Sequence, residues 1–143
     1  MPSLADALMV IDATTGGESA NSYVTLAFAD AYFADTLEAR EWLGYDRDVR
    51  RAALMAATAT IDAQAIAGEP YVAGCQECGR GGQALRFPRV EDRDSEGSVR
   101  VPDGVCYATC ELALFVLRAS ITADNMPRRV RKLLRPFIVE RGT

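Results

Sequence analysis

The sequence contains no histidine and only one lysine, Lys132, among its 143 residues. Without histidine there is no Ser-His or Cys-His pair to activate a nucleophile and no imidazole ligand for a metal ion. A Ser-Lys pair has one candidate lysine, which lies within a run of arginines. We therefore expect a protein that is not an enzyme and that uses no cofactor.

The sequence also lacks a phosphate-binding loop and a hydrophobic run long enough to cross a membrane. The glycine-rich stretch from Gly79 to Gly82 is not followed by the Lys-Ser or Lys-Thr pair that holds nucleotide phosphates. No basic region precedes the first apolar residues, as it would in a secretory signal peptide. We expect the protein to begin in a cytosol and to have no membrane partner.

Charge is distributed unevenly along the chain, although the formal net charge is only −4. Residues 1–48 carry nine acidic residues and two arginines, and residues 49–125 carry ten acidic residues and eight arginines. Residues 126–143 carry six basic residues and one acidic residue. A basic segment on an acidic body is typical of a segment that contacts nucleic acid or an acidic protein surface. The alternative is a solvated helix face.

Apolar residues at helical spacing predict an all-α fold, a small helical bundle of three main helices. The central helix is expected within residues 101–121, where apolar residues are dense enough for burial on most sides. The other two are expected over residues 26–39 and 47–67. The residues expected to cap the three helices are Thr25, Asp46 and Asp103. The expected core consists of Phe33, Leu54, Ile61, Leu112, Phe115 and Val116.

The other segments are expected to be irregular or extended. Residues 68–101 are rich in glycine and in charge, which predicts a long loop with a short β-hairpin between Leu85 and Arg100. The N-terminal residues are expected to form an extended arm along a neighbouring subunit. The helical domain is therefore predicted to span residues 1–125, with a basic C-terminal arm at residues 126–143.

The four cysteines raise the question of a zinc site. Cys75 and Cys78 form a CxxC pair, and Cys106 and Cys110 lie four residues apart on the predicted central helix. Four thiolates could hold a tetrahedral zinc ion, and a disulfide within the CxxC pair is a second alternative. The apolar helical setting of the other pair favours reduced thiols instead. We expect no metal, with these four cysteines as the only candidates.

The C-terminal segment is the predicted partner-binding site. A short basic helix is expected from Arg128 to Leu134, and an extended apolar strip from Phe137 to Val139 follows it. Because the body offers this strip no obvious partner, we expect the segment to leave the domain and dock on another chain, where its arginines would pair with carboxylates or DNA phosphates. The candidate residues are Arg128, Arg129, Arg131, Lys132, Arg135, Phe137, Ile138 and Val139.

Three stretches together resemble a known family. They are ANSYVTLAFADAYFA at residues 20–34, RRAALMAATATIDA at residues 50–63 and QALRFPR at residues 83–89. In this order they are similar to tailed-phage head–tail connector (adaptor) proteins, which are often labelled DnaT-like single-stranded-DNA-binding proteins. The cysteine-containing loop at residues 69–82 and the arginine-rich C-terminal segment depart from the family pattern.

The resemblance implies a structural subunit of a ring, expected as a dodecamer, that joins the portal protein to a tail-side neck protein. The protein would lie in the virion neck, after assembly in the host cytoplasm, and DNA would pass through the lumen without specific binding. The label implies the alternative, a single-stranded-DNA-binding protein. An acidic body with aromatic residues at core spacing favours the connector, because single-strand binding uses aromatic platforms along a basic groove.

Overall fold

The computed structural model describes residues 10–71, 82–119 and 126–139, and within these ranges the fold is all-α, as the sequence predicts. In chain order the elements are α2 (Leu26–Ala34), α3 (Ala39–Gly44), α4 (Arg47–Asp62), α5 (Asp103–Arg118), α6 (Arg128–Leu134) and the 3-10 helix η1 (Arg135–Phe137). No helix in the described part of the chain is both long enough and apolar enough to span a bilayer.

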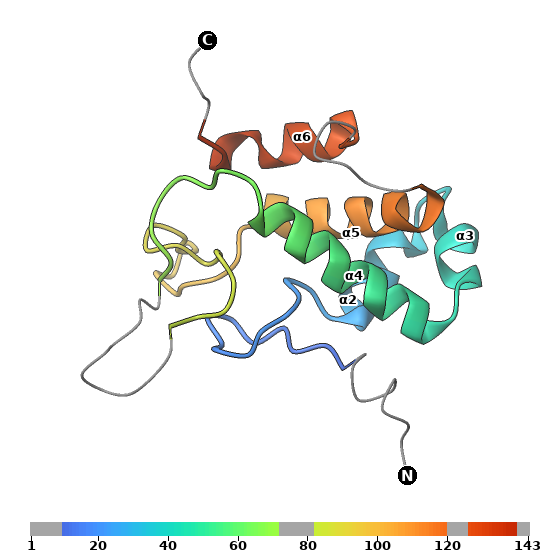
Figure 1. Ribbon diagram of the computed structural model, residues 1–143, viewed down its shortest axis with the longest axis horizontal. Helices are drawn as coiled ribbons and strands as arrows, with labels where there is room; N and C mark the ends of the chain where they lie inside the picture. The colour runs from blue at the N-terminus through green and yellow to red at the C-terminus, as the bar shows by residue number, and fades with distance from the viewer. Residues whose placement is uncertain (1–9, 72–81, 120–125, 140–143) are drawn as a thin grey trace.

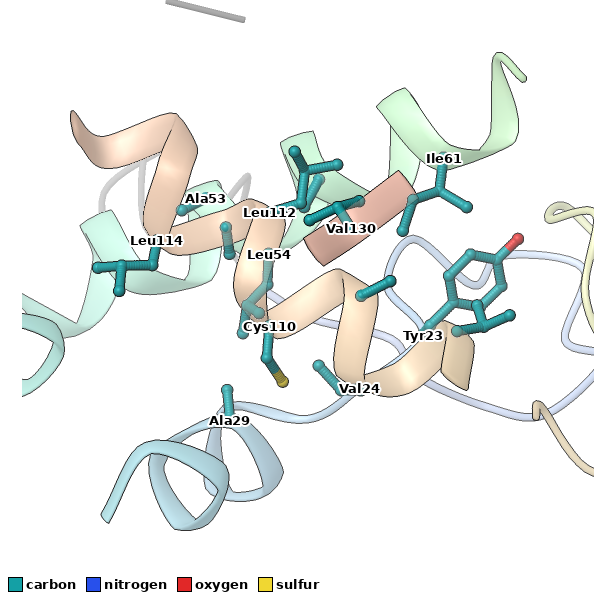
Figure 2. Packing of buried hydrophobic residues seen from close by; sticks show 14 of the residues in the cluster. Tyr23, Val24, Ala29, Ala53, Leu54, Ile61, Cys110, Leu112, Leu114 and Val130 are labelled. Atoms are coloured by element: carbon teal, nitrogen blue, oxygen red, sulfur yellow. The ribbon is translucent and has the colours of Figure 1, made fainter. Parts of the chain in front are cut away.

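Helix α5 forms the centre of the fold and packs against both α4 and α6 (Figure 1). Leu112 of α5, Leu54 of α4 and Val130 of α6 are each fully buried, and all three belong to one apolar core (Figure 2). Burial of a leucine or valine side chain contributes about 1.5–3 kcal/mol relative to exposure. The contacts of α5 with its two neighbours therefore account for much of what holds the helices together.

The predicted core is confirmed in four of its six residues. The buried members are Phe33, Leu54, Ile61 and Leu112. Phe115 and Val116 are only partly buried, because they lie on the last turns of α5, where Val116 lines a groove open to solvent. The density of apolar residues along α5 predicted burial on most sides of the helix, but the neighbouring helices cover fewer sides near its end.

The helix boundaries depend on local side-chain hydrogen bonds. Thr25 is confirmed as the N-cap of α2, since its Oγ1 accepts from the Phe28 N–H at 3.0 Å. The helix expected over residues 26–39 is interrupted after Ala34, where the Thr36 hydroxyl donates to the Phe33 carbonyl at 2.8 Å and favours a turn. The helix expected over residues 47–67 ends at Asp62.

The other two expected caps differ from the prediction. Asp46 occupies the N-cap position of α4, but its side chain makes no capping hydrogen bond. Asp103 is the first residue of α5 rather than its cap, and Pro102 takes the cap position. The Asp103 carboxylate instead forms an ion pair with Arg100, which draws it away from the free N–H groups of the helix.

The long loop is anchored to the helices through buried polar contacts. Arg89 forms an ion pair with Asp92 at 2.8 Å and donates to the Ala67 carbonyl at 3.0 Å. The expected β-hairpin is reduced, in the described residues, to a single bridge between Arg93 and Val99. Two backbone hydrogen bonds flank this bridge: the Asp94 N–H donates to the Ser98 carbonyl at 2.9 Å, and the Arg100 N–H donates to the Asp92 carbonyl at 3.0 Å.

A second anchor ties the N-terminal segment and the loop to the end of α4. The Tyr23 hydroxyl donates to Asp62, which also accepts from the Arg86 N–H at 3.1 Å. The same Tyr23 hydroxyl accepts from the Phe87 N–H at 3.2 Å. Burial raises the pKa of the Asp62 carboxyl above its usual value. Three separate segments therefore meet at one partly buried carboxylate.

The C-terminal segment belongs to the body as far as Val139, so the expectation that it leaves the domain is wrong for the described residues. Leu134 is fully buried against the core, and Ile138 forms a bridge with Ile66. The Val139 N–H donates to the Ala65 carbonyl at 2.7 Å. The apolar strip thus has a partner in its own chain, just after α4. Residues 140–143 lie outside the described ranges.

Candidate nucleic-acid interface

Five basic residues lie on the outward side of α6 and directly after its last residue, and they are here called the basic face. Burial of Val130 and Leu134 fixes the orientation of the helix, and helical geometry then places the charged side chains away from the core. All members of the basic face are exposed, and together they line an open hollow of about 750 Å³. They are Arg128, Arg129, Arg131, Lys132 and Arg135. Figure 1 shows α6 along one edge of the molecule.

Three of the five basic residues on this face have no carboxylate partner among the described residues. Arg129 pairs with Glu111 of α5, with Nε lying 2.8 Å from Oε1. Within the part of the chain that the structure describes, no carboxylate pairs with Arg128, Lys132 or Arg135. Like charges on adjacent turns repel one another, so this arrangement favours an external anion.

Next to the basic face lies a row of three stacked aromatic rings, here called the aromatic row. Its members are Phe28 and Tyr32 of α2 and Tyr107 of α5. The centroids of Phe28 and Tyr107 are 6.4 Å apart with planes inclined by 19°, and those of Tyr107 and Tyr32 are 5.4 Å apart with planes inclined by 24°. Phe28 and Tyr107 are each 38% exposed. The row therefore presents aromatic surface to solvent.

Tyr32 joins the aromatic row to the basic face. Its hydroxyl donates to Glu111 Oε1 at 2.8 Å and accepts from Arg129 Nη2 at 3.5 Å. Burial is the main cause that raises the pKa of Tyr32, to about 12, and the neighbouring Glu111 acts in the same direction. The hydroxyl consequently stays protonated at neutral pH and can donate to the carboxylate. One carboxylate and one hydroxyl thus hold Arg129 at the edge of the row.

The exposure of this row corrects the expectation that the aromatic residues lie at core spacing. Phe33 and Trp42 are indeed buried, but Phe28 and Tyr107 are not. Phe28 and Tyr107 each lie one residue before a buried position, at Ala29 and Ala108. The one-residue offset from the buried helical row is the sequence signal that identifies them as neighbours of the core rather than members of it.

The apolar half of the predicted partner site is used inside the molecule. Phe137 makes an edge contact with Phe87 at a centroid distance of 5.6 Å, and the Arg89 guanidinium lies 5.1 Å from the Phe137 ring. Ile138 pairs with Ile66, and only Val139 remains about half exposed. A site on this segment therefore consists of its basic residues, without the apolar strip.

The cysteines that the structure describes are two free thiols on α5. Cys110 is buried, and burial raises the pKa of Cys106 to about 11, so that thiol is protonated at neutral pH. Cys75 and Cys78 lie outside the described ranges, and the absence of a zinc site there stays a prediction. Among described residues, no three metal-binding side chains gather closely enough to hold an ion.

Fold and surface together define a small all-α protein with one basic helix face on an otherwise acidic body. The chain belongs to the family described as "Putative DnaT-like ssDNA binding protein", whose model matches residues 7–136. The matched span runs across the loop at residues 69–82 and helix α6, the two segments expected to depart from the family pattern. No curated protein and no solved structure matches the chain.

Proposed function

We propose that this protein binds single-stranded DNA, with phosphates of the strand on the basic face of α6. The observation that carries the proposal is the exposed set Arg128, Lys132 and Arg135, which no carboxylate in the described residues neutralises. Arginine suits this task because its planar guanidinium pairs phosphate oxygens through two hydrogen bonds. The description of the family agrees with this proposal.

The acidic body is compatible with such binding because charge is segregated in the fold. Phosphate contacts provide most of the affinity in non-specific DNA binding, and each contact releases counterions from the strand. A negative body would repel the strand everywhere except along α6, and would therefore orient the complex rather than prevent it. We expect one binding face, weak sequence preference and strong dependence on salt.

The test is a titration of a labelled oligothymidylate, followed by fluorescence anisotropy at several salt concentrations. The variant carries Arg128→Gln and Arg135→Gln. The matched control carries Arg40→Gln and Arg47→Gln, which remove the same charge from exposed arginines on α3 and α4 that have no carboxylate partner among the described residues. Purely electrostatic attraction to net charge would affect both variants equally.

We expect the α6 variant to bind more weakly than the control. Its plot of log affinity against log salt should become shallower by about 0.7 for each lost phosphate contact. Equal weakening of both variants, or undetectable binding by the unmodified protein, contradicts the proposal. Equal binding of duplex and single-stranded DNA would support phosphate binding by this face but contradict a function specific to single strands.

A second candidate function is that of a ring subunit in a phage head–tail connector, which the resemblance of residues 20–34, 50–63 and 83–89 implies. A groove of about 360 Å³ between α4 and α5 favours it, because the lining is almost wholly apolar. The groove residues are Asp48, Val49, Ala52, Ala53, Ala56, Val116 and Leu117. Exposed apolar surface of this kind is typical of subunit contacts, and we infer that a second copy of the chain covers it.

Light scattering on the purified protein tests this candidate. We expect a ring-sized mass that falls to the mass of a monomer with Val49→Glu, since Val49 is exposed at the groove. The control is Val90→Glu, the same change at an exposed valine in the loop. A monomer at every concentration, or an equal response of both variants, contradicts the connector. Neither candidate function involves catalysis.

A further inference from the structure

We propose that the aromatic row formed by Phe28, Tyr107 and Tyr32 is a stacking platform for unpaired bases of the strand whose phosphates lie on α6. This inference rests on the proposed single-stranded-DNA binding and adds the part of the site that contacts bases. Aromatic platforms beside a basic surface are the combination by which proteins hold single strands without reading their sequence.

The rings of this row leave aromatic surface available for a base. Face-to-face contact between carbon atoms occurs at about 3.5–4.0 Å, whereas the centroids of Phe28 and Tyr107 are 6.4 Å apart at a small inclination. The two rings are therefore displaced or separated, and neither covers the whole face of the other. The exposed fraction of 38% for each of the two residues agrees with this geometry.

The platform and the basic face are adjacent because Tyr32 belongs to the row and contacts Arg129. The row runs from Phe28 through Tyr107 to Tyr32, and Arg129 Nη2 lies 3.5 Å from the Tyr32 hydroxyl. Glu111 is the acidic group at this junction, and its pairing with Arg129 at 2.8 Å offsets its repulsion of a phosphate. A strand can therefore pass from the basic face to the row without crossing an unpaired carboxylate of this junction.

The row would also favour single strands over duplex. In a duplex both faces of each base are covered by neighbouring base pairs, so no base is free to stack on protein rings. In a single strand every base has an accessible π-face, whatever its identity. The row would consequently distinguish single strands from duplex without distinguishing base sequences. The basic face would supply the part of the affinity that depends on salt.

The test compares an oligothymidylate with an abasic oligonucleotide of the same length, which has the same phosphates and no bases. We expect the unmodified protein to bind the oligothymidylate more tightly by about fivefold or more, the ratio that corresponds to stacking of one base. The variant Phe28→Leu with Tyr107→Leu keeps apolar side chains and removes both exposed rings. We expect it to bind the two oligonucleotides equally, with its affinity for the abasic strand unchanged.

Two controls separate a local from a general effect. Tyr71→Leu removes an aromatic ring that is 45% exposed on the loop, and should leave the preference for bases intact. Circular dichroism and the denaturation midpoint should show that the double variant is folded. If those rings were needed for folding, Tyr107→Phe, which retains the ring, should keep both the fold and the preference.

The possible results distinguish this inference from the proposed function. Equal binding of both oligonucleotides by the unmodified protein, with weaker binding by Arg128→Gln and Arg135→Gln, overturns the platform and leaves phosphate binding standing. A preference for bases that survives in the Phe28→Leu and Tyr107→Leu variant also overturns it. If the unmodified protein binds neither oligonucleotide detectably, both proposals are overturned together.

Discussion

Two buried arginines of the body and two exposed arginines at the ends of α6 differ in what they contact. In the body, Arg50 pairs with Asp30 at 2.5 Å, and Arg89 pairs with Asp92 at 2.8 Å; their side chains are only 9% and 10% exposed. On α6, Arg128 and Arg135 are exposed, and no carboxylate among the described residues pairs with them. The net charge of a segment therefore does not reveal whether its charge is available to a ligand.

The same difference separates contributions to stability from contributions to binding. A buried ion pair whose partner is removed leaves an uncompensated charge in a medium of low dielectric constant. An exposed cation is screened by water and salt and contributes little to the free energy of unfolding. Substitutions of buried, paired arginines in the body should consequently lower stability, whereas substitutions of exposed arginines at the ends of α6 should lower affinity for DNA and leave stability almost unchanged.

The largest loss of stability is expected for Arg89→Ala. The change leaves Asp92 buried without its partner, and it removes the contact of the guanidinium with the Phe137 ring. Breaking a buried pair in this way costs about 3–5 kcal/mol, to be measured by urea denaturation. Arg40→Ala, at an exposed arginine of α3, is the control and should be almost neutral. If Arg89→Ala lost no more stability than the control, other contacts would hold the loop.

The next largest effect is expected for Leu134→Ala in α6. Leu134 is fully buried, and truncation of a buried leucine to alanine costs about 2–5 kcal/mol. Deletion of residues 126–143 should destabilise the body even more, because it also removes Val130 and the bridge of Ile138. An unchanged denaturation midpoint in the truncated protein would support the prediction from the sequence that this segment is an arm detached from the body.

A smaller loss is expected for Phe115→Ala. Complete burial would give about 3–5 kcal/mol for this change, but Phe115 is only partly buried near the end of α5. With part of its area exposed, we expect about 1–2 kcal/mol in chemical denaturation. Phe33→Ala, at a fully buried ring of α2, is the comparison and should cost more. Equal losses would mean that the end of α5 is covered more fully than its exposure indicates.

Sequence patterns predicted the helices better than their surroundings. Helical periodicity identified α6 with both of its boundaries, Arg128 and Leu134, and it identified the central position of α5. These features follow from local spacing of apolar residues. The gap between α2 and α3 does not, because it depends on a hydroxyl of Thr36 that competes for a backbone carbonyl.

The candidate site was predicted only in part for a similar reason. The basic residues of α6 are evident from the sequence, but their apolar companions Phe137 and Ile138 face their own body. Their partners, Phe87 and Ile66, lie more than forty residues earlier in the chain, so no local pattern reveals the contact. The aromatic row likewise requires α2 and α5 to be side by side, which a single sequence does not show.

The smallest effect on stability, and the sharpest test of the comparison, is expected for Arg128→Gln with Arg135→Gln. Arg128 lies four residues before Lys132 in a helix, a spacing at which like charges repel by about 0.2–0.5 kcal/mol. Arg128 is also the first residue of α6, where the helix dipole disfavours a cation. Arg135 is the C-cap of α6, where the same dipole favours a cation, so the two substitutions have opposing effects. The stability of the double variant should therefore stay within a few tenths of a kcal/mol of that of the unmodified protein at low salt. Any difference should disappear at high salt, because screening weakens interactions of exposed charges.

Thermal denaturation at low and high salt measures this change, and Arg40→Gln with Arg47→Gln is again the control. If removal of these charges leaves stability unchanged or raises it and also weakens DNA binding, the charges serve binding rather than folding. A loss comparable to that of Arg89→Ala would show that the basic face is part of the structural framework. Arg128 and Arg135 would then not form a ligand site, and the contrast with the body would fail.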